Sequence, residues 1–515
     1  SKRSNEQSSK LTKILIISIL FSILNYKNMD TSRKLPRNAD YMSHLPLAMR
    51  SESKRRNYFP TNGQSFTSTG NNIIRIDISG DSFLDTKNSY LTFRFNNTTG
   101  QACGFDFGGG QTFIRRLRIE QAGNVLTDCN NYNKLLSSIL LPAQGDRDNL
   151  KSRSITESAR FNNDKANGNA TAPTPVADLS GASLTTPAHG AGLIINNAVA
   201  PPGVPTPGST CTFCIPLVNG LLGVNQDKMI PLQLLGSSPL TIEIELCPAL
   251  DIGVFGGVPV AYTVDTVRYV AALVETPPAL DEQLRMVQEQ SGGAIMLSGE
   301  DYTHFQGTIS AAATGQQNIN VPARRRSIKS ILWSGASQTF VAGGALAQDV
   351  RYNLSYGGNF NMQEYSVRVG SVQYPSEPVQ CNYAGAAGTS AFVRSEHCTE
   401  LEKCFGTLGS TVGLGSLCAS NFAVADTDVA QMTTVVAPGA PDATHQFCPF
   451  GIDMESFQRV TAGHDGVNTA DRATPITLQL TIGNPGAGEA ITIDAFVCYD
   501  SLFYIDSSGS IRVSF

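Results

Sequence analysis

Two short stretches of the sequence decide the fold: residues 239–246 read PLTIEIEL, and residues 475–482 read PITLQLTI. In both, apolar and polar side chains alternate with a period of two. Because successive side chains of a β-strand point to opposite faces, this alternation predicts strands with one packed face and one wetter face. That pattern is typical of antiparallel sheets packed into a sandwich.

The surroundings of the two stretches are also similar. A Phe-Cys pair precedes each of them, at 213–214 and at 447–448, and a Gly-rich turn followed by a strand comes after each, around Asp265 and around Asp494. The same strand series therefore occurs twice, which indicates an internal duplication. About eight strands with long connections in each copy favour a jelly roll over a seven-stranded immunoglobulin-like domain.

The composition agrees with a chain of many short elements. The 515 residues include 47 Gly and 26 Pro, and only 16% of them are charged. Gly and Pro at this frequency punctuate strands and turns, so long helices are not expected. Coiled coil, collagen and bulk disorder are excluded, and no apolar run reaches the roughly 18 residues that a membrane-spanning helix needs.

Further patterned runs organise the rest of the chain. Strands are expected at 74–78, 91–95, 365–369, 491–497 and 511–515, and short helices at 135–140, 280–287 and 401–405. We predict three parts: a basic, largely flexible N-terminal arm over 1–56, a first jelly roll over 57–285 with a loop insertion at about 162–209, and a second jelly roll over 286–515 with a loop insertion at about 381–443. Loops of that length usually carry function or an interface.

The N-terminal arm differs in charge from the body of the chain. Residues 1–60 contain 12 Lys or Arg and 4 Asp or Glu, whereas the remaining residues are net acidic. Such an arm either lies against nucleic acid or an anionic membrane, or is a solvated tail. Residues 14–24 form an apolar run with the length of a signal-peptide core, and Met29 is the first methionine, so the role of this run and the native start stay open.

Motifs of catalysis are missing from the sequence. The six histidines are isolated, and there is no HExxH, P-loop or G-x-S-x-G motif. We therefore predict that the protein is not an enzyme and that it has no metal site and no cofactor. His464, Asp465 and Asp471 offer acid–base groups, but the Gly and Asn residues around them favour a polar turn.

The cysteines do not indicate a metal or a disulfide scaffold. There are 11 of them, an odd number at low density, which is not the pattern of a secreted disulfide framework. Cys211 and Cys214 lack the second Cys or His pair of a structural zinc site, and His397, Cys398 and Cys404 lack a fourth ligand. Buried, reduced thiols are the expected state, with the last group packed at a helix end.

The densest basic cluster outside the arm lies just before the strand expected from residue 328. Clusters of this kind bind phosphates or the carboxylates of a neighbouring subunit, and an exposed cluster at a strand start is the alternative. With the last basic residues of the arm, this cluster completes the candidate contact residues: Lys54, Arg55, Arg56, Arg324, Arg325, Arg326 and Lys329.

Four stretches resemble one protein family. Residues 213–246, FCIPLVNGLLGVNQDKMIPLQLLGSSPLTIEIEL, are similar to the segment that closes the first roll of double jelly-roll major capsid proteins of eukaryotic DNA viruses. Residues 325–336, RRSIKSILWSGA, and 364–379, EYSVRVGSVQYPSEPV, resemble the opening strands of the second roll, and 496–515, FVCYDSLFYIDSSGSIRVSF, resemble the C-terminal strand and hairpin. The similarity extends over about 57–515, and virophage and polinton-like virus capsid proteins look like the nearest relatives.

The resemblance implies a role in a capsid. It implies a homotrimer whose paired upright rolls form a pseudo-hexagonal capsomer of an icosahedral shell, with the long loops as its outer tower. It further implies localisation in the virion, and neighbouring capsomers, penton proteins and minor capsid proteins as partners. The basic arm would face the capsid interior, where it would contact the genome or an internal membrane.

The alternative is a secreted carbohydrate-binding or carbohydrate-active β-sandwich protein. Lectins share this fold class, and residues 14–24 fit a secretion leader. A retaining glycosidase, however, needs two carboxyl groups across an aromatic-rich cleft. Only 8% of the residues are aromatic, and Trp333 is the single tryptophan, which disfavours this alternative.

Overall fold

A computed structural model describes most of the chain beyond residue 50. The described residues are 51–99, 103–104, 108–144, 156, 210–236, 238–252, 254–255, 260–310, 313–337, 354, 362–381, 395–405, 449–455, 466–471, 475–482 and 490–514. The apolar run at 14–24, His464 and Asp465, and nearly all of the two predicted loop insertions lie outside these residues.

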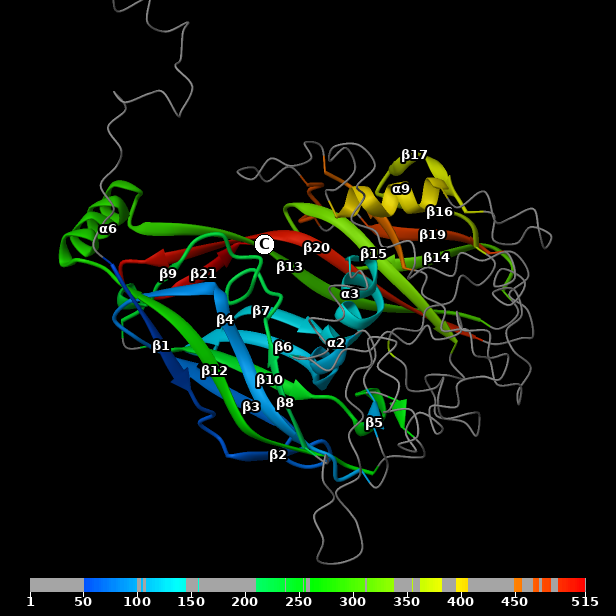
Figure 1. The fold of residues 1–515 in the computed structure, drawn as a ribbon. Helices are drawn as coiled ribbons and strands as arrows, with labels where there is room; N and C mark the ends of the chain where they lie inside the picture. The colour runs from blue at the N-terminus through cyan, green and yellow to red at the C-terminus, as the bar shows by residue number, and fades with distance from the viewer. Residues whose placement is uncertain are drawn as a thin grey trace, which may run out of the picture. The chain divides into compact units, whose positions relative to one another are not determined.

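Eight strands form the first jelly roll: β1 (Glu52–Tyr58), β3 (Ile73–Ile78), β4 (Phe83–Asn96), β6 (Ile114–Gln121), β7 (Asn124–Asn130), β8 (Thr210–Ile215), β10 (Leu240–Leu246) and β12 (Thr263–Glu275). They pair in two antiparallel sheets with the orders β1-β12-β4-β8 and β3-β10-β6-β7 (Figure 1). Two short strands, β2 (Ser65–Thr67) and β9 (Ile230–Pro231), add to the first sheet by pairing with β12 and β4.

Eight further strands form the second jelly roll: β13 (Ala294–Ile309), β14 (Gly315–Val321), β15 (Ile328–Ser337), β16 (Met362–Val369), β17 (Val372–Gln380), β18 (Phe450–Asp453), β19 (Ile476–Ile482) and β20 (Ile491–Asp506). Their sheets have the orders β13-β20-β15-β18 and β14-β19-β16-β17. The final strand, β21 (Ile511–Ser514), forms a hairpin with β20.

The two rolls share one topology. With the eight strands of each roll numbered along the chain, the two sheet orders are 1-8-3-6 and 2-7-4-5 in both rolls. The duplication predicted from the sequence agrees with this order, because β10 and β19 are each the seventh strand and β12 and β20 are each the eighth. The predicted fold class, an all-β chain with two consecutive eight-stranded jelly rolls, is confirmed.

Short helices lie between the strands. The 3-10 helix η1 (Gly109–Phe113) precedes β6, and the sequence α2 (Tyr132–Leu135), η2 (Leu136–Leu140, a π-helical turn) and α3 (Leu141–Gln144) follows β7. Helix α6 (Pro278–Gln290) connects the rolls along the chain, and α9 (Ser395–Cys404) precedes β18. The remaining elements are η5 (Leu232–Leu234), η6 (Ala249–Asp251) and the pair β5 (Cys103–Gly104) and β11 (Val254–Phe255).

The sequence alternation becomes burial on one face of the strands. In β19 every second residue is buried, from Ile476 to Ile482, and the residues between them are half-buried. The first roll packs a cluster of aromatic rings between its sheets, with neighbouring centroids 5.1–6.4 Å apart: Phe93, Phe95, Phe113 and Phe213. Burial of large apolar side chains of this kind is the main stabilising contribution in each roll.

Strand β20 departs from the one-sided pattern. Its residues 491–499 are all buried, so both faces of this strand are covered. One face belongs to the core of the second roll, whereas Phe496 and Phe503 belong to the same apolar cluster as the first-roll core. The first roll therefore packs directly on the sheet that contains β20.

The structure places the start of the first roll earlier than residue 57. Strand β1 begins at Glu52 and pairs with β12 over its whole length, so residues 52–56 belong to a sheet and not to the arm. The predicted insertions at 162–209 and 381–443 both fall between the fifth and the sixth strand of their rolls. In the second insertion the described residues include α9.

Candidate functional site

The basic cluster before β15 divides into residues with different surroundings. Arg324 and Arg326 are exposed. Arg325 is half-buried: its guanidinium carbon lies 4.3 Å from the centroid of the Tyr499 ring, and its Nη2 donates to the hydroxyl of Thr303 over 3.1 Å. Arg325 therefore attaches the start of β15 to β13 and β20, whereas its two neighbours point to solvent.

Lys329, the fourth residue of the cluster, binds two carboxylates of its own chain. Its ammonium forms ion pairs with Glu300 and, over 2.8 Å, with Glu455. Burial by itself would lower the pKa of Lys329, but the nearby negative charges, with Glu300 and its hydrogen bond foremost, together outweigh burial, so the pKa is raised. Lys329 is thus charged and engaged within the fold.

The basic residues of β1 lie at the edge of a sheet. Lys54 forms an ion pair with Glu275 over 2.6 Å, and both side chains are about half exposed. The guanidinium carbons of Arg55 and Arg56 lie 5.7 and 5.0 Å from the centroids of tyrosine rings on β4 and on β1 itself. Charged side chains on an edge strand hinder unspecific pairing with other strands and leave their charges available to an anionic partner.

A buried ion pair joins the two rolls, and sequence reasoning did not single it out. The ammonium of Lys134 on α2 contacts the carboxylate of Asp494 on β20, and Nε2 of His304 on β13 lies 2.8 Å from the same carboxylate. Burial would raise the pKa of Asp494, which is 1% exposed, but Lys134 and the hydrogen bond from His304 lower it to about 2. The junction therefore contains a charged carboxylate that depends on a cation from the other roll.

A second buried carboxylate lies at the junction. Asp301 on β13 accepts hydrogen bonds from the backbone N–H of Gly220, over 2.9 Å, and from Nδ2 of Asn219, over 3.1 Å. Burial raises the pKa of Asp301 to about 6, although Gly220, Ser501 and Arg325 act in the opposite direction. The loop after β8 is thus held on the second roll by a buried carboxyl group with a raised pKa.

Close backbone contact accompanies these polar contacts. A Cβ atom placed on Gly299 of β13 would lie 1.9 Å from the carbonyl oxygen of Gly220, so only glycine allows this approach. Further along, the side-chain amide of Gln121 donates to the carbonyl of Gly509 over 2.9 Å and accepts from the N–H of Ile511 over 2.7 Å. The junction is therefore hydrogen-bonded as well as apolar.

The His and Cys candidates lie in packed surroundings. His397 on α9 is buried, its Nε2 lies 2.8 Å from the carbonyl oxygen of Pro449, and its ring stacks on Phe450 with centroids 4.6 Å apart. Burial raises the pKa of the Cys404 thiol. The cysteines whose side chains the structure describes are free thiols.

Two features are not found among the described residues. No group of three or more His, Cys, Asp or Glu side chains there has the geometry of a metal site. In the same part of the chain, no helix combines the length and the apolar character needed to cross a membrane.

Comparison with known proteins gives matches of structure and none of sequence. No protein-family model and no curated protein matches the sequence. The fold matches the Faustovirus major capsid protein with a TM-score of 0.51 and 8% identity, over 92% of this chain and 93% of that chain. It matches a chain of the Sputnik virophage structure, solved by cryo-EM, with a TM-score of 0.50 and 10% identity, over 94% of this chain and 92% of that chain.

These matches and the repeated strand order define the class of fold. The chain is a double jelly roll. More specifically, it has the fold that the Faustovirus major capsid protein also has. At identities of about one residue in ten, the likeness concerns the fold.

Proposed function

We propose that this protein is a viral major capsid protein that assembles as trimeric, pseudo-hexagonal capsomers into an icosahedral shell. The observation that carries the proposal is the duplication: one chain contains two rolls of identical strand order joined through a buried junction. A trimer of such chains contains six similar rolls around its axis. Its outline is therefore close to hexagonal, and particles with this outline can pack side by side in a shell. Its role is then architectural and not catalytic, and its location is the virion.

The finer assignments rest on the same reasoning together with the sequence resemblance. The proposed relatives are virophage and polinton-like virus capsid proteins. The proposed partners are copies of this chain, neighbouring capsomers, and penton and minor capsid proteins. The basic arm is proposed to face the interior and to contact the genome or an internal membrane.

The proposed contact residues are of two kinds. Arg324 and Arg326 are exposed before β15, and Arg55 and Arg56 are exposed on the edge strand β1, so these four have accessible charge for carboxylates of a neighbouring subunit or for an anionic interior. Lys54, Arg325 and Lys329 also belong to the proposed set, but each forms an ion pair or a side-chain hydrogen bond within its own chain. We expect them to contribute to an assembly contact only through their remaining hydrogen-bonding capacity.

The proposal is tested by the oligomeric state and by microscopy of the expressed full chain. Size-exclusion chromatography with light scattering is expected to give the mass of a trimer, and electron micrographs are expected to show hexagonal particles or closed shells. The double variant Arg324→Ser/Arg326→Ser should weaken assembly and leave the fold unchanged by circular dichroism, with Arg368→Ser, on the exposed side of β16, as the matched control. A stable monomer under all assembly conditions would contradict the proposal, and a monomer that binds glycans would favour the alternative.

A further inference from the structure

A cavity of about 360 Å³ lies at the junction of the two rolls. Its walls come from η2, α3 and the loop after β8 in the first roll, and from β13, β15, β20 and α9 in the second. This volume is within the range of small-molecule sites, and junctions of structural units are a common place for them. The lining residues are Leu136, Leu140, Leu141, Val218, Val224, Asn225, Glu300, Tyr302, Lys329, Ser330, Cys404, Phe405, Glu455 and Cys498.

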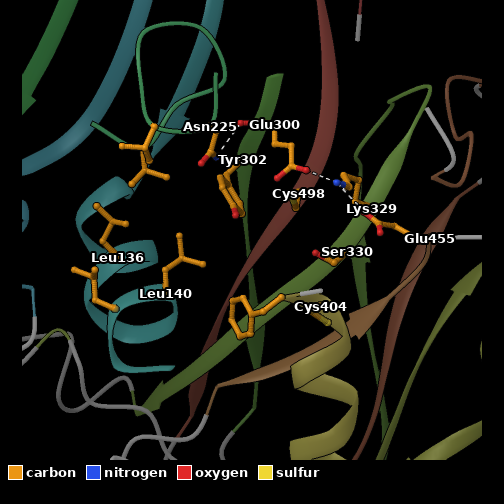
Figure 2. A pocket seen from close by; sticks show the side chains of 14 residues that line it. Leu136, Leu140, Asn225, Glu300, Tyr302, Lys329, Ser330, Cys404, Glu455 and Cys498 are labelled. Atoms are coloured by element: carbon orange, nitrogen blue, oxygen red, sulfur yellow. Dashed lines mark hydrogen bonds and ion pairs between the residues drawn. The ribbon is translucent and has the colours of Figure 1, made fainter. Parts of the chain in front are cut away.

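The cavity has an apolar side and a charged side. Figure 2 shows Leu136 and Leu140 on the helical side, Glu300, Lys329 and Glu455 on the opposite side, and Tyr302 between them. The apolar side is completed by Val218 and Val224. Such a lining fits a ligand with an apolar body and one polar head.

The charged side has an excess of negative charge. The carboxylates of Glu300 and Glu455 both bind the single ammonium of Lys329, so the three groups together carry a net charge of one negative unit. Each carboxylate has several acceptor positions and a lysine ammonium has three donors in total, so the acceptors outnumber the donors. Asp500, beside this group on β20, also raises the pKa of Lys329 and adds to the negative field.

The same arrangement disfavours other ligand heads. An anionic head would meet a net negative site in which the ammonium of Lys329, the only one among the lining residues that the structure describes, already binds two carboxylates. A covalent adduct with the lining thiols is disfavoured as well, because burial raises the pKa of both Cys404 and Cys498 and keeps them protonated. A donor-rich cation complements the charged side best.

We propose that this cavity binds an amphipathic organic cation, with an apolar body against Leu136 and Leu140 and an ammonium head against the oxygens of Glu300 and Glu455 that do not contact Lys329. The ligand would touch both rolls, so it would stabilise their junction by binding the folded state alone. This proposal is independent of capsid assembly, because every group that it uses belongs to one chain.

The unmodified full chain provides the first test, by calorimetric titration with three ligands of matched shape: phenylbutylamine, phenylbutanol and phenylbutyrate. The amine is expected to bind about tenfold tighter than the alcohol, and the carboxylate weakest, because only the amine gains a charge-assisted contact. The amine should also raise the midpoint of thermal unfolding, and added salt should reduce its advantage over the alcohol. Equal binding of amine and carboxylate, or binding of none of the three, would overturn the proposal.

Two variants with opposite expected effects sharpen the test. Glu455→Gln removes the excess negative charge and should weaken amine binding about tenfold while leaving the alcohol unchanged. Lys329→Gln leaves two carboxylates without their cation and should strengthen amine binding by about the same factor. Glu275→Gln, a carboxylate-to-amide change at the partly exposed end of β12 and outside the cavity lining, is the control and should leave amine binding unchanged. Amine binding that responds equally to all three variants would contradict the placement of the head.

Discussion

The eighth strands of the two rolls, β12 and β20, occupy the same place in the same topology, but their surroundings differ. Each has an aspartate after a buried aliphatic residue. Asp265 on β12 is 23% exposed and binds Arg94 of the neighbouring strand in two hydrogen bonds of 2.6 and 2.8 Å. Asp494 on β20 is 1% exposed and binds Lys134 of the other roll.

This difference indicates how two duplicated rolls come to depend on each other in one folded chain. An ion pair within a sheet and near solvent contributes little to stability, since water solvates both charges when the pair is broken. A buried pair across a junction is different, because removal of one charge leaves the other without compensation in a low-dielectric environment. The second roll thus depends on the first for its charge balance, whereas no such dependence is visible at Asp265 among the described residues.

The largest expected effect comes from removing the buried carboxylate. Asp494→Ala leaves Lys134 buried without its partner and should lower the free energy of unfolding by about 3–5 kcal/mol, measured by urea denaturation. The double variant Asp494→Leu/Lys134→Met removes both charges and should recover most of this loss. A loss below about 1 kcal/mol in the single variant would show that the junction tolerates the free charge.

An intermediate effect is expected in the free energy of unfolding, which should depend on pH through the carboxyl group of Asp301. Its carboxyl has a pKa of about 6 in the fold, above its ordinary value near 3.8. At Asp301 the folded state therefore binds a proton more tightly than the unfolded state does. The stabilisation that this proton provides is complete below about pH 4 and is lost as the pH rises through 6. The size of the contribution is about 2–3 kcal/mol.

Asp301→Asn imitates the protonated carboxyl, because the amide oxygen still accepts from Gly220 and Asn219. The variant should match the wild type near pH 4 and be more stable at pH 7, measured as unfolding free energy across this range. Asp494 gives the opposite sign: its pKa is lowered to about 2, so its stabilisation is present above about pH 4 and is lost as the pH falls toward 2. Identical pH profiles of the wild type and Asp301→Asn would refute the assignment of this titration to Asp301.

The smallest effect is expected at the counterpart of Asp494 in the first roll. Asp265→Ala breaks a partly exposed pair with Arg94 and should lower the free energy of unfolding by about 0.5–1 kcal/mol. The pKa of Asp265 is lowered chiefly by the hydrogen bond from Arg94, with a further contribution from Asn96. The same urea titration as for Asp494 gives the comparison directly, and equal losses for the two alanine variants would remove the distinction drawn between the two strands.

Much of the fold was predictable from local pattern. Alternation in 239–246 and 475–482 is enough to identify strands, because a period of two places one set of side chains on the packed face whatever that face contacts. The duplication follows from the same local evidence, since similar patterns in the same order give the same topology. The helices at 135–140, 280–287 and 401–405 were visible as apolar residues at helical spacing.

The candidate contact residues are visible in the sequence as basic clusters, but their surroundings are not. The sequence places Arg324, Arg325 and Arg326 just before a strand, whereas the predicted arm over 1–56 misses that Lys54, Arg55 and Arg56 belong to β1. That Arg325 stacks on Tyr499 and that Lys329 binds Glu300 and Glu455 are not visible in the sequence, because these partners are distant in the chain or come from another strand.

The sequence by itself determined that the elements of the chain are mostly strands and that one strand series occurs twice, since both depend on periodicity and propensity within each segment. Only the tertiary structure decided that both faces of β20 are buried, that Asp494 meets Lys134 and that a cavity lies between Leu136 and Glu455. The physical reason is that burial and pairing depend on which surfaces meet in space, and residues far apart in the chain carry no local mark of the partner that they will contact.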